Sequence, residues 1–337
     1  MLPETFRCYL VTKNDAGNIR GDFTHRPLTE LPAGEVLIRV AYSSLNYKDA
    51  LAATGNPGVN KIFPHIPGVD AAGVVAQSGV YEFVPGDLVL ATGYDIGANR
   101  WGAWAEYVRV PQDWVVPLPK GLTARETMML GTAGLTAALC VDALERHNVT
   151  PDGGDVLVTG ASGGVGSIAV AILSKLGFRV VAATGKATAH EYLRSLGAAE
   201  VVGREAVADQ TGKPLLPRRW SGAVDTVGGA TLSAVIRATR HFGCVAACGN
   251  VGGHDLPLTV YPFILRGVTL AGIDAAQCPL DVRHDLWSRL AGPWKLDRLS
   301  DIARVIDFVD LPPNIPAILA GQLTGRLALR IADSEEA

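Results

Sequence analysis

The feature that most constrains the fold is a glycine-rich turn between an apolar strand and an apolar helix. The run "DVLVTG" is followed by the small residues "ASGGVG" and then by "SIAVAILSKLG", whose apolar residues recur at helical spacing. A helix that starts in this way offers unpaired backbone N–H groups to a pair of phosphates, and side chains would block their approach. The glycines that keep the approach open are Gly160, Gly163, Gly164 and Gly166. We therefore predict a dinucleotide site, although a glycine-rich turn by itself also fits any tight strand-to-helix connection.

The end of the next predicted strand indicates which dinucleotide binds. Sites that prefer NAD usually carry Asp or Glu there to bind the ribose diol. This sequence instead has Thr184, Gly185 and Lys186, and Arg204 follows the third strand. A hydroxyl, a free N–H and positive charges suit a 2′-phosphate, which a carboxylate would repel. We predict NADPH rather than NADH; in the alternative interpretation, Lys186 and Arg204 are solvated surface cations.

The order of the expected elements predicts an α/β fold with two domains. From about residue 126, apolar strands alternate with helices at spacings of roughly 25 residues, which indicates parallel βαβ units with right-handed crossovers. The expected strands of this doubly wound sheet are "DVLVTG", "RVVAATG", "AEVVG", "GAVDTVG", "GCVAACG" and "VTLAGI". Before residue 125, short β-rich runs separated by Pro, Gly and Asn are typical of an antiparallel or barrel-like domain. After about residue 280 we expect a helix and then a returning strand in "QLTGRLALRIAD".

The last strand of the parallel sheet, Val268 to Ile273, predicts a dimer. It is apolar and lies at the sheet margin, where an uncovered strand exposes unpaired backbone groups. Pairing with the same strand of a second copy would cover it. We therefore expect a homodimer through residues 268–273.

Composition and charge exclude several classes of protein. With 337 residues, 48% of them hydrophobic, the chain is long enough for about two domains with sizeable cores. A net charge of -3 without clustered cations argues against nucleic acid as a partner. No stretch reads as a signal peptide or as a membrane span. Five dispersed cysteines are typical of a reduced protein, so we expect a cytoplasmic location.

Six motifs, in order along nearly the whole chain, resemble the medium-chain dehydrogenase/reductase superfamily and, within it, the zinc-free quinone-oxidoreductase branch. They are "SSLNYKDA" (43–50), "PGVDAAG" (67–73), "WGAWAEY" (101–107), "GTAGLTA" (131–137), "TGASGGVG" (159–166) and "FILRGV" (263–268). The nearest resemblance is to the NADPH-dependent acryloyl-CoA reductase group. It implies a Rossmann domain, residues 126–279, inserted into a GroES-like, partly barrel-shaped catalytic domain built from residues 1–125 and 280–337.

The resemblance also draws attention to positions that lack metal ligands. Zinc-dependent alcohol dehydrogenases of the superfamily carry Cys, His-Glu, and Cys or Asp at the positions that here hold Asn46, Val69-Asp70 and Thr132. None of these residues offers the nitrogen or sulfur ligand that catalytic zinc prefers. The four closely spaced cysteines of the superfamily's structural zinc lobe are missing as well. We therefore expect no metal.

The resemblance places the candidate catalytic residues in "NYKD", beside the nicotinamide. Tyr47 is the first candidate because a phenol donates a hydrogen bond or a proton; alternatively, it only packs on the cofactor. Asn46 and Asp49 are expected to hold the local turn through bonds to nearby backbone, with direct catalysis as the alternative. Asp70 is expected to be a structural group.

The resemblance further implies a set of cofactor contacts. The pyrophosphate is expected against Ser162, Gly163, Gly164 and Val165, and the adenosine phosphate against Thr184, Gly185, Lys186 and Arg204. The nicotinamide end is expected near Thr136, Asn250, Ile264 and Ala275, with Leu323 and Arg326 from the returning tail. Asn250 departs from the family pattern, in which we expect an apolar residue.

Without a metal, such a site is expected to reduce an activated alkene. Hydride from NADPH goes to the β-carbon, donors stabilise the negative charge that develops on an oxygen, and a proton reaches the α-carbon. We expect the substrate to be a short α,β-unsaturated acyl-CoA, with acryloyl-CoA converted to propanoyl-CoA. A quinone or enone reductase and a non-catalytic NADPH-binding protein are the alternatives. Arg266, Arg326 and Arg330 are either contacts to CoA or ordinary exposed charges.

Overall fold

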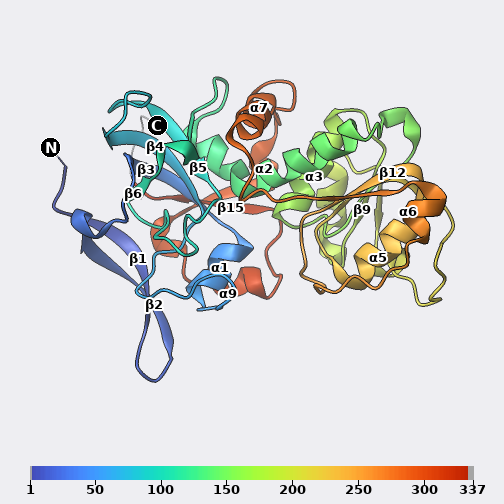
Figure 1. The fold of residues 1–337 in the computed structure, drawn as a ribbon, viewed down its shortest axis with the longest axis horizontal. Coiled ribbons are helices and arrows are strands. Elements are labelled where there is room, and N and C mark those ends of the chain that lie inside the picture. The colour runs from blue at the N-terminus through green and yellow to red at the C-terminus, as the bar shows by residue number, and fades with distance from the viewer. Residues whose placement is uncertain (1, 333–337) are drawn as a thin grey trace. The chain divides into compact units, whose positions relative to one another are not determined.

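The computed structural model describes residues 2–332, which form two compact units (Figure 1). The first unit holds the chain up to Thr132, Ala276–Ala291 and the chain from Arg298 onward. The second unit holds Ala133–Ala275 and Gly292–Asp297. The chain therefore leaves the first unit within a helix, a little beyond residue 125, and a short segment after residue 280 groups with the second unit.

The second unit is built on a six-stranded parallel sheet. Its strands are β8 (Val156–Val158), β9 (Val180–Ala183), β10 (Glu200–Val202), β11 (Trp220–Asp225), β12 (Thr239–Ala247) and β13 (Thr269–Gly272). They lie in the order β10-β9-β8-β11-β12-β13, so the chain proceeds in opposite directions on the two sides of β8. This is the doubly wound arrangement, and the predicted α/β fold class is confirmed.

Helices connect these parallel strands. They are α3 (Gly164–Lys175), α4 (His190–Ser195), α5 (Gly229–Ala238) and α6 (Tyr261–Arg266). Side chains of α5, such as Leu232 and Ile236, share a buried apolar core with Leu157, Val181 and Val245 of the sheet. The strands are apolar on both faces because helices cover both, which explains the near-continuous apolar runs in the sequence.

The first unit contains a mixed seven-stranded sheet that takes strands from both ends of the chain. Its strands are β3 (Val36–Leu45), β4 (Asp70–Ser78), β5 (Leu88–Thr92), β6 (Tyr107–Val110), β7 (Val115–Pro117), β14 (Ala303–Asp307) and β15 (Arg326–Arg330). The order is β14-β15-β3-β4-β5-β7, and β6 also pairs with β3. β15 is parallel to β14 and antiparallel to β3, so the returning strand at the end of the chain completes the N-terminal sheet.

Helices and a ribbon complete the first unit. The helices are α1 (Tyr47–Ala53), α7 (Leu280–Ala291), α8 (Leu299–Ile302) and α9 (Asn314–Leu319). The ribbon, which composition alone does not predict, pairs β1 (Thr5–Lys13) with β2 (Ile19–Pro27) and ends in the free loop seen in Figure 1. Tyr9 anchors it, because its ring packs edge-on against Phe23 and Trp104 at centroid distances of 5.3 and 5.9 Å.

One helix, α2 (Ala124–Arg146), leads from the first unit into the second. It is long and apolar enough to cross a membrane by length and composition, but 89% of its apolar window is buried inside the protein, as in the core helix of a soluble protein. Its backbone is kinked at Gly131, whose φ of 54° and ψ of −155° are not helical. Only glycine adopts such a conformation without strain, so the kink is encoded in the sequence.

Candidate functional site

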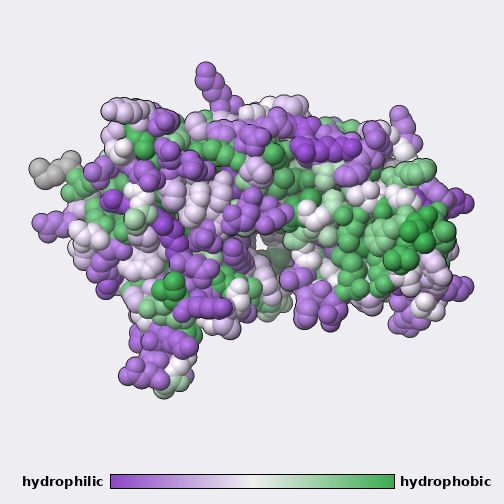
Figure 2. All heavy atoms as spheres, in the orientation of Figure 1, coloured by the Kyte–Doolittle hydropathy of each residue, from purple (hydrophilic) through white to green (hydrophobic). Residues whose placement is uncertain are grey.

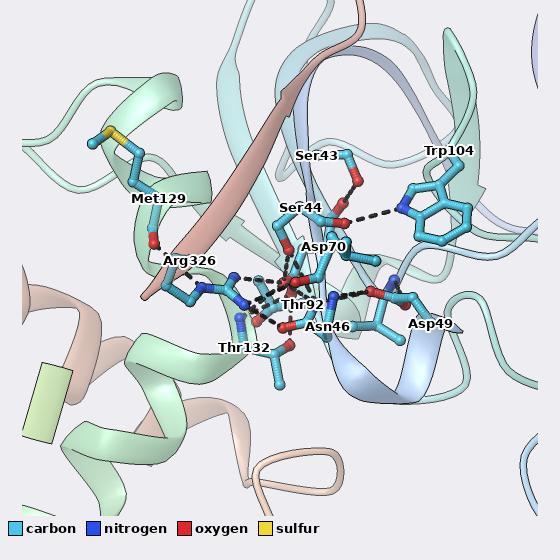
Figure 3. Close-up of polar contacts among 12 residues, drawn as sticks. Ser43, Ser44, Asn46, Asp49, Asp70, Thr92, Trp104, Met129, Thr132 and Arg326 are labelled. Atoms are coloured by element: carbon cyan, nitrogen blue, oxygen red, sulfur yellow. Dashed lines mark hydrogen bonds and ion pairs between the residues drawn. The ribbon is translucent and has the colours of Figure 1, made fainter. Parts of the chain in front are cut away.

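A buried polar cluster lies in the first unit where four segments of the chain meet (Figure 3). We call it the Asp70 cluster; its members are Ser44, Asn46, Asp49, Asp70, Thr132 and Arg326. The positions at which zinc-dependent relatives were expected to hold their ligands, Asn46, Asp70 and Thr132, are thereby brought into one hydrogen-bonded group. Within residues 2–332, no group of three or more His, Cys, Asp or Glu side chains is arranged to hold a metal ion.

Asp49 ties the start of α1 to the start of β4. Its Oδ2 accepts hydrogen bonds from the backbone N–H of Asn46 at 2.8 Å and from the Asn46 side-chain amide at 3.0 Å. Its Oδ1 accepts from the backbone N–H of Val69 at 2.8 Å. Asn46 is the residue before the first turn of α1, where such reciprocal bonds satisfy free N–H groups. The expectation that Asn46 and Asp49 hold the local turn agrees with these bonds.

Asp70 is fully buried and accepts hydrogen bonds from several donors. Ser44 Oγ donates to its Oδ2 at 2.5 Å, and the Asn46 amide donates to the same oxygen at 2.9 Å. Thr132 donates to Oδ1 from its hydroxyl at 2.6 Å and to both oxygens from its backbone N–H at 3.0 Å. A buried carboxylate requires such compensation.

Gly131 allows this approach of α2 to Asp70. A Cβ at position 131 would lie 2.5 Å from Asp70 Oδ2 and 2.7 Å from Arg326 Nη2. The kink therefore serves two purposes: it turns the N–H of Thr132 toward Asp70 and leaves room for the guanidinium of Arg326.

Arg326 is not the exposed cation that one sequence interpretation expected, since only 5% of the residue is accessible. Its Nη1 donates to Asn46 Oδ1 at 2.8 Å and to the backbone carbonyl of Leu45 at 3.2 Å, and its Nη2 lies 3.9 Å from Asp70 Oδ2. The two other candidate contacts to CoA are also engaged within the protein. Arg266 donates to three backbone carbonyls, and Arg330 pairs with Asp307.

Burial dominates the electrostatics of the cluster. It raises the pKa of the Asp49 carboxyl to about 7, and the charge of Asp70 raises it further, against the lowering effect of the N–H donors from Asn46 and Val69. Burial also lowers the pKa of Arg326, although the two carboxylates favour its charged form. The guanidinium stays positive at any physiological pH because its ordinary pKa is so high.

Tyr47, the first catalytic candidate, is the first residue of α1 and is 41% exposed. It therefore follows directly on Asn46, which the cluster holds, while its own side chain reaches solvent. Its catalytic role remains a prediction.

The glycine-rich turn of the second unit has the geometry of a phosphate site. Gly160 follows β8 with a φ of 56°, and α3 begins at Gly164. A Cβ on Gly166 would lie 2.5 Å from the Gly160 carbonyl oxygen, so glycine is needed there for close packing of helix on turn. The N–H groups of the first helical turn have no carbonyl partner within the helix. They suit a pyrophosphate next to Ser162, Gly163 and Val165, which stays our prediction.

The two predicted cations at the ribose phosphate lie near the end of β9. Thr184 is buried, and its hydroxyl contacts Ser162 Oγ at 2.9 Å and accepts from the N–H of Lys186 at 3.2 Å. A Cβ on Gly185 would lie 2.1 Å from Arg204 Nε, so the guanidinium lies against that glycine. The structure thus brings Thr184, Lys186 and Arg204 together beside the turn.

The other predicted cofactor contacts divide into two groups. Asn250 and Ala275 follow β12 and β13, which are parallel neighbours, so both lie at the carboxyl edge of the sheet, as ligand residues in such sheets do. Thr136 is buried in α2, and Leu323 packs on the core of the first unit.

Ile264 lies on α6, and its contact with the nicotinamide end stays a prediction. It is 67% exposed on α6, and Arg266, two residues later, bonds to the carbonyls of Arg237 and Thr239 at the amino end of β12. α6 precedes β13 in the chain, whereas Ala275 follows that strand.

Sequence reasoning missed Asp225, which ends β11 and is fully buried. It accepts from Thr159 Oγ1 at 2.6 Å and from the N–H of Gly228 at 2.7 Å. Thr226 Oγ1 donates to the carbonyl of Thr159 at 3.0 Å. These bonds hold the turn at Gly160 against the end of β11. The sequence did contain a signal for Asp225, because a single acidic residue ends the apolar run "GAVD".

Comparison with known proteins identifies the family. A model described as "Alcohol dehydrogenase GroES-like domain" matches residues 32–120, and one described as "Zinc-binding dehydrogenase" matches residues 164–291. Acrylyl-CoA reductase AcuI of Ruegeria pomeroyi is 43% identical over 327 residues, which cover 97% of this chain and 99% of that protein. The chain belongs to the medium-chain dehydrogenase/reductase superfamily. The zinc-binding description concerns a range that excludes Asn46, Asp70 and Thr132.

Two further members of the superfamily are similar over almost the whole chain. The putative quinone oxidoreductase YhfP of Bacillus subtilis is 47% identical, covering 90% of this chain and 92% of that protein. Its crystal structure with NAD bound covers 97% of this chain and 100% of that one, with a TM-score of 0.94 and 45% identity. The YhdH oxidoreductase of Salmonella enterica, in complex with NADP, has the same coverage, identity and TM-score. The quinone-oxidoreductase branch predicted from the motifs is confirmed.

We predict that Asp49→Asn reduces the pH dependence of stability. Because the Asp49 carboxyl has a pKa of about 7 when folded and 3.8 as its ordinary value, the folded chain binds the extra proton. The stability that this bound proton contributes to the fold is present below about pH 4 and is lost as the pH rises to about 7. Over this range the free energy of unfolding falls by at most ~1.4 kcal/mol per pH unit. Urea unfolding from pH 5 to 7.5 should show the wild-type advantage over Asp49→Asn shrinking as pH rises. Asp22→Asn, which removes an exposed carboxylate, is the control; a constant or growing advantage contradicts the prediction.

Proposed function

We propose that this protein is a metal-independent, NADPH-dependent reductase of the carbon–carbon double bond of a short α,β-unsaturated acyl-CoA, converting acryloyl-CoA to propanoyl-CoA. The observation that supports this proposal best is the Asp70 cluster. The positions expected to hold zinc ligands in alcohol dehydrogenases are occupied by hydrogen bonds to one another and to Arg326. Alcohol oxidation in this fold needs a metal to stabilise an alkoxide, whereas conjugate reduction does not. The relatives named acrylyl-CoA reductase point to the same substrate class.

The cofactor is proposed to be NADPH. The Salmonella relative contains NADP and YhfP contains NAD, so the family accommodates both. In this chain a hydroxyl and two cations, from Thr184, Lys186 and Arg204, meet where a 2′-phosphate would lie. No carboxylate precedes them at the end of β9 to repel it.

The residues of this chain act on the substrate by position and hydrogen bonding. Bound NADPH supplies the hydride. The phenol of Tyr47 donates a hydrogen bond to the oxygen on which negative charge develops, or a proton to the α-carbon. Asn46 and Asp49 fix the turn that carries it. Thr136, Asn250 and Ala275 would hold the nicotinamide end.

Two other functions are separated from this one by a single assay. Following NADPH absorbance with acryloyl-CoA, crotonyl-CoA and a simple quinone in parallel should show oxidation with the acyl-CoA substrates. Turnover of the quinone alone would overturn the acyl-CoA proposal in favour of a quinone reductase. No oxidation with any of them would favour a protein that binds NADPH without catalysis.

Lys186→Ala tests the cofactor assignment. Losing one ammonium from the 2′-phosphate site should raise the KM for NADPH by about tenfold or more and leave the KM for NADH nearly unchanged, since charge-assisted bonds are worth roughly 1.5–3 kcal/mol. Steady-state kinetics with both cofactors measures the ratio. Lys213→Ala, at an exposed lysine on another loop, is the control. An unchanged NADPH/NADH preference would show that Lys186 does not bind the phosphate.

We also propose a cytoplasmic homodimer. β13 is the edge strand of its sheet, and α6 beside it exposes apolar side chains, which contribute to the hydrophobic area over α5 and α6 in Figure 2. These exposed residues are Val260, Tyr261, Ile264 and Leu265. A second copy of the same strand pairs with an open edge and covers such a face.

Sedimentation equilibrium should therefore give twice the monomer mass at micromolar concentration. Ile264→Glu, which places a charge in the apolar face, should shift the equilibrium toward monomer, while Val309→Glu, at an exposed apolar residue of the first unit, should not. A wild-type monomer at this concentration would contradict the dimer.

A further inference from the structure

Arg326 is the single cation of the Asp70 cluster, and it is enclosed with two carboxylates. Asp49 and Asp70 are completely buried, and the side chain of Arg326 is 3% accessible. Figure 3 shows the guanidinium next to Asp70 and directed toward Asn46. Apart from Arg326 and the two carboxylates, the polar side chains of the cluster are the neutral amide of Asn46 and the hydroxyls of Ser44 and Thr132. Arg326 thus supplies the one fixed positive charge in a place where zinc-dependent relatives were expected to hold a metal.

The contacts of Arg326 are directed mainly at Asn46 rather than at Asp70. Nη1 donates to Asn46 Oδ1 at 2.8 Å, a short bond, and Nε approaches the Met129 carbonyl at 3.4 Å. Nη2 lies 3.9 Å from Asp70 Oδ2 and makes no hydrogen bond. An arginine that served only to neutralise Asp70 would form the two-pronged pair that guanidinium and carboxylate favour. The geometry instead gives the best bond to the neutral amide.

Asn46 links Arg326 to both carboxylates through hydrogen bonds. With its Oδ1 accepting from Arg326, its amide N–H groups point to Asp49 Oδ2 at 3.0 Å and to Asp70 Oδ2 at 2.9 Å. The reverse orientation of the amide would place an oxygen against two carboxylates and an N–H₂ group against the guanidinium. Arg326 and the two carboxylates together therefore determine which way Asn46 faces.

The orientation of Asn46 matters because α1 begins at the next residue. Its backbone N–H and its side chain both bond to Asp49, so its position sets the first turn of α1 and with it Tyr47. Tyr47 is the exposed candidate donor, so a small rotation of this turn would move its hydroxyl. Misplacement of a catalytic group by about 1 Å can cost roughly 100-fold in rate.

We propose that Arg326 is a positioning residue for the reduction: its guanidinium fixes the Asn46 amide and thereby holds Tyr47 in place. The competing interpretation is that Arg326 only balances buried negative charge. Our proposal rests on the proposed function in naming Tyr47 as the residue that acts on the substrate.

Two variants separate these interpretations because both keep the net charge of the cluster. Arg326→Lys retains the positive charge but loses the planar guanidinium with its forked set of N–H donors. The double variant Asp70→Asn with Arg326→Gln removes one charge of each sign and also loses the fork. If Arg326 positions Asn46, both variants should lose kcat by about tenfold or more, with the dissociation constant of NADPH changed less than about twofold. If charge balance is its only role, both should keep kcat within about twofold of wild type, which would overturn the proposal.

A double-mutant cycle tests the route through Asn46. Asn46→Ala removes the amide that Arg326 holds, so Asn46→Ala with Arg326→Lys should be no slower than Asn46→Ala alone, since residues that act through one another are not additive. Losses that add in full would overturn the proposal. Arg20→Lys, at an exposed arginine of β2, is the matched control and should leave kcat unchanged.

The readout does not depend on the identity of the substrate. The variants are assayed with whichever acceptor the wild type reduces, so failure of the acyl-CoA assignment leaves this test intact. Hydrogen exchange of the α1 amides, residues 47–53, requires no substrate, and both charge-balanced variants should exchange faster there than wild type while exchange in α3 is unchanged. Wild-type exchange in α1 would overturn the proposal even if the protein proves to be non-catalytic.

Discussion

The first unit depends on the burial of one carboxylate. Asp70 has no access to water, and a carboxylate in that position is tolerated only if donors replace its hydration. The donors come from the end of β3, from the residue after the kink in α2 and, at longer range, from the first residue of β15. Four segments that are remote in sequence must therefore meet before any of them is satisfied. This constraint accounts for the kink at Gly131, whose missing side chain leaves the space that the carboxylate and guanidinium share.

In the second unit, the feature on which the predicted phosphate site depends is the reversal of strand order at β8. The turn at Gly160 lies at this reversal, and the carboxyl ends of β9, β11, β12 and β13 lie on the same edge of the sheet. Asp225 and Thr226 clamp the turn from the neighbouring strand. A phosphate site of this kind is made of backbone, so it requires rigid support more than it requires reactive side chains.

Local patterns in the sequence predicted the parallel sheet and its turn, because strand, glycines and helix are adjacent in the chain. The missing metal ligands were also visible, since absence of a residue type needs no geometry. What replaces the ligands was not visible: Arg326 looked like a surface charge because nothing in "TGRLALR" shows that its first arginine is turned inward.

The position of β15 has a consequence for the synthesis of the chain. All strands of the second unit have been synthesised once the chain reaches Gly272. The sheet of the first unit is incomplete until residues 326–330 have been synthesised and pair with β3. Domains tend to fold as units while the chain emerges from the ribosome. The inserted unit is therefore able to form while Asp70 is still open to water, and the site closes last. A ribosome that stops before codon 326 would release a chain that has every strand of the second unit but whose Asp70 cluster lacks Arg326.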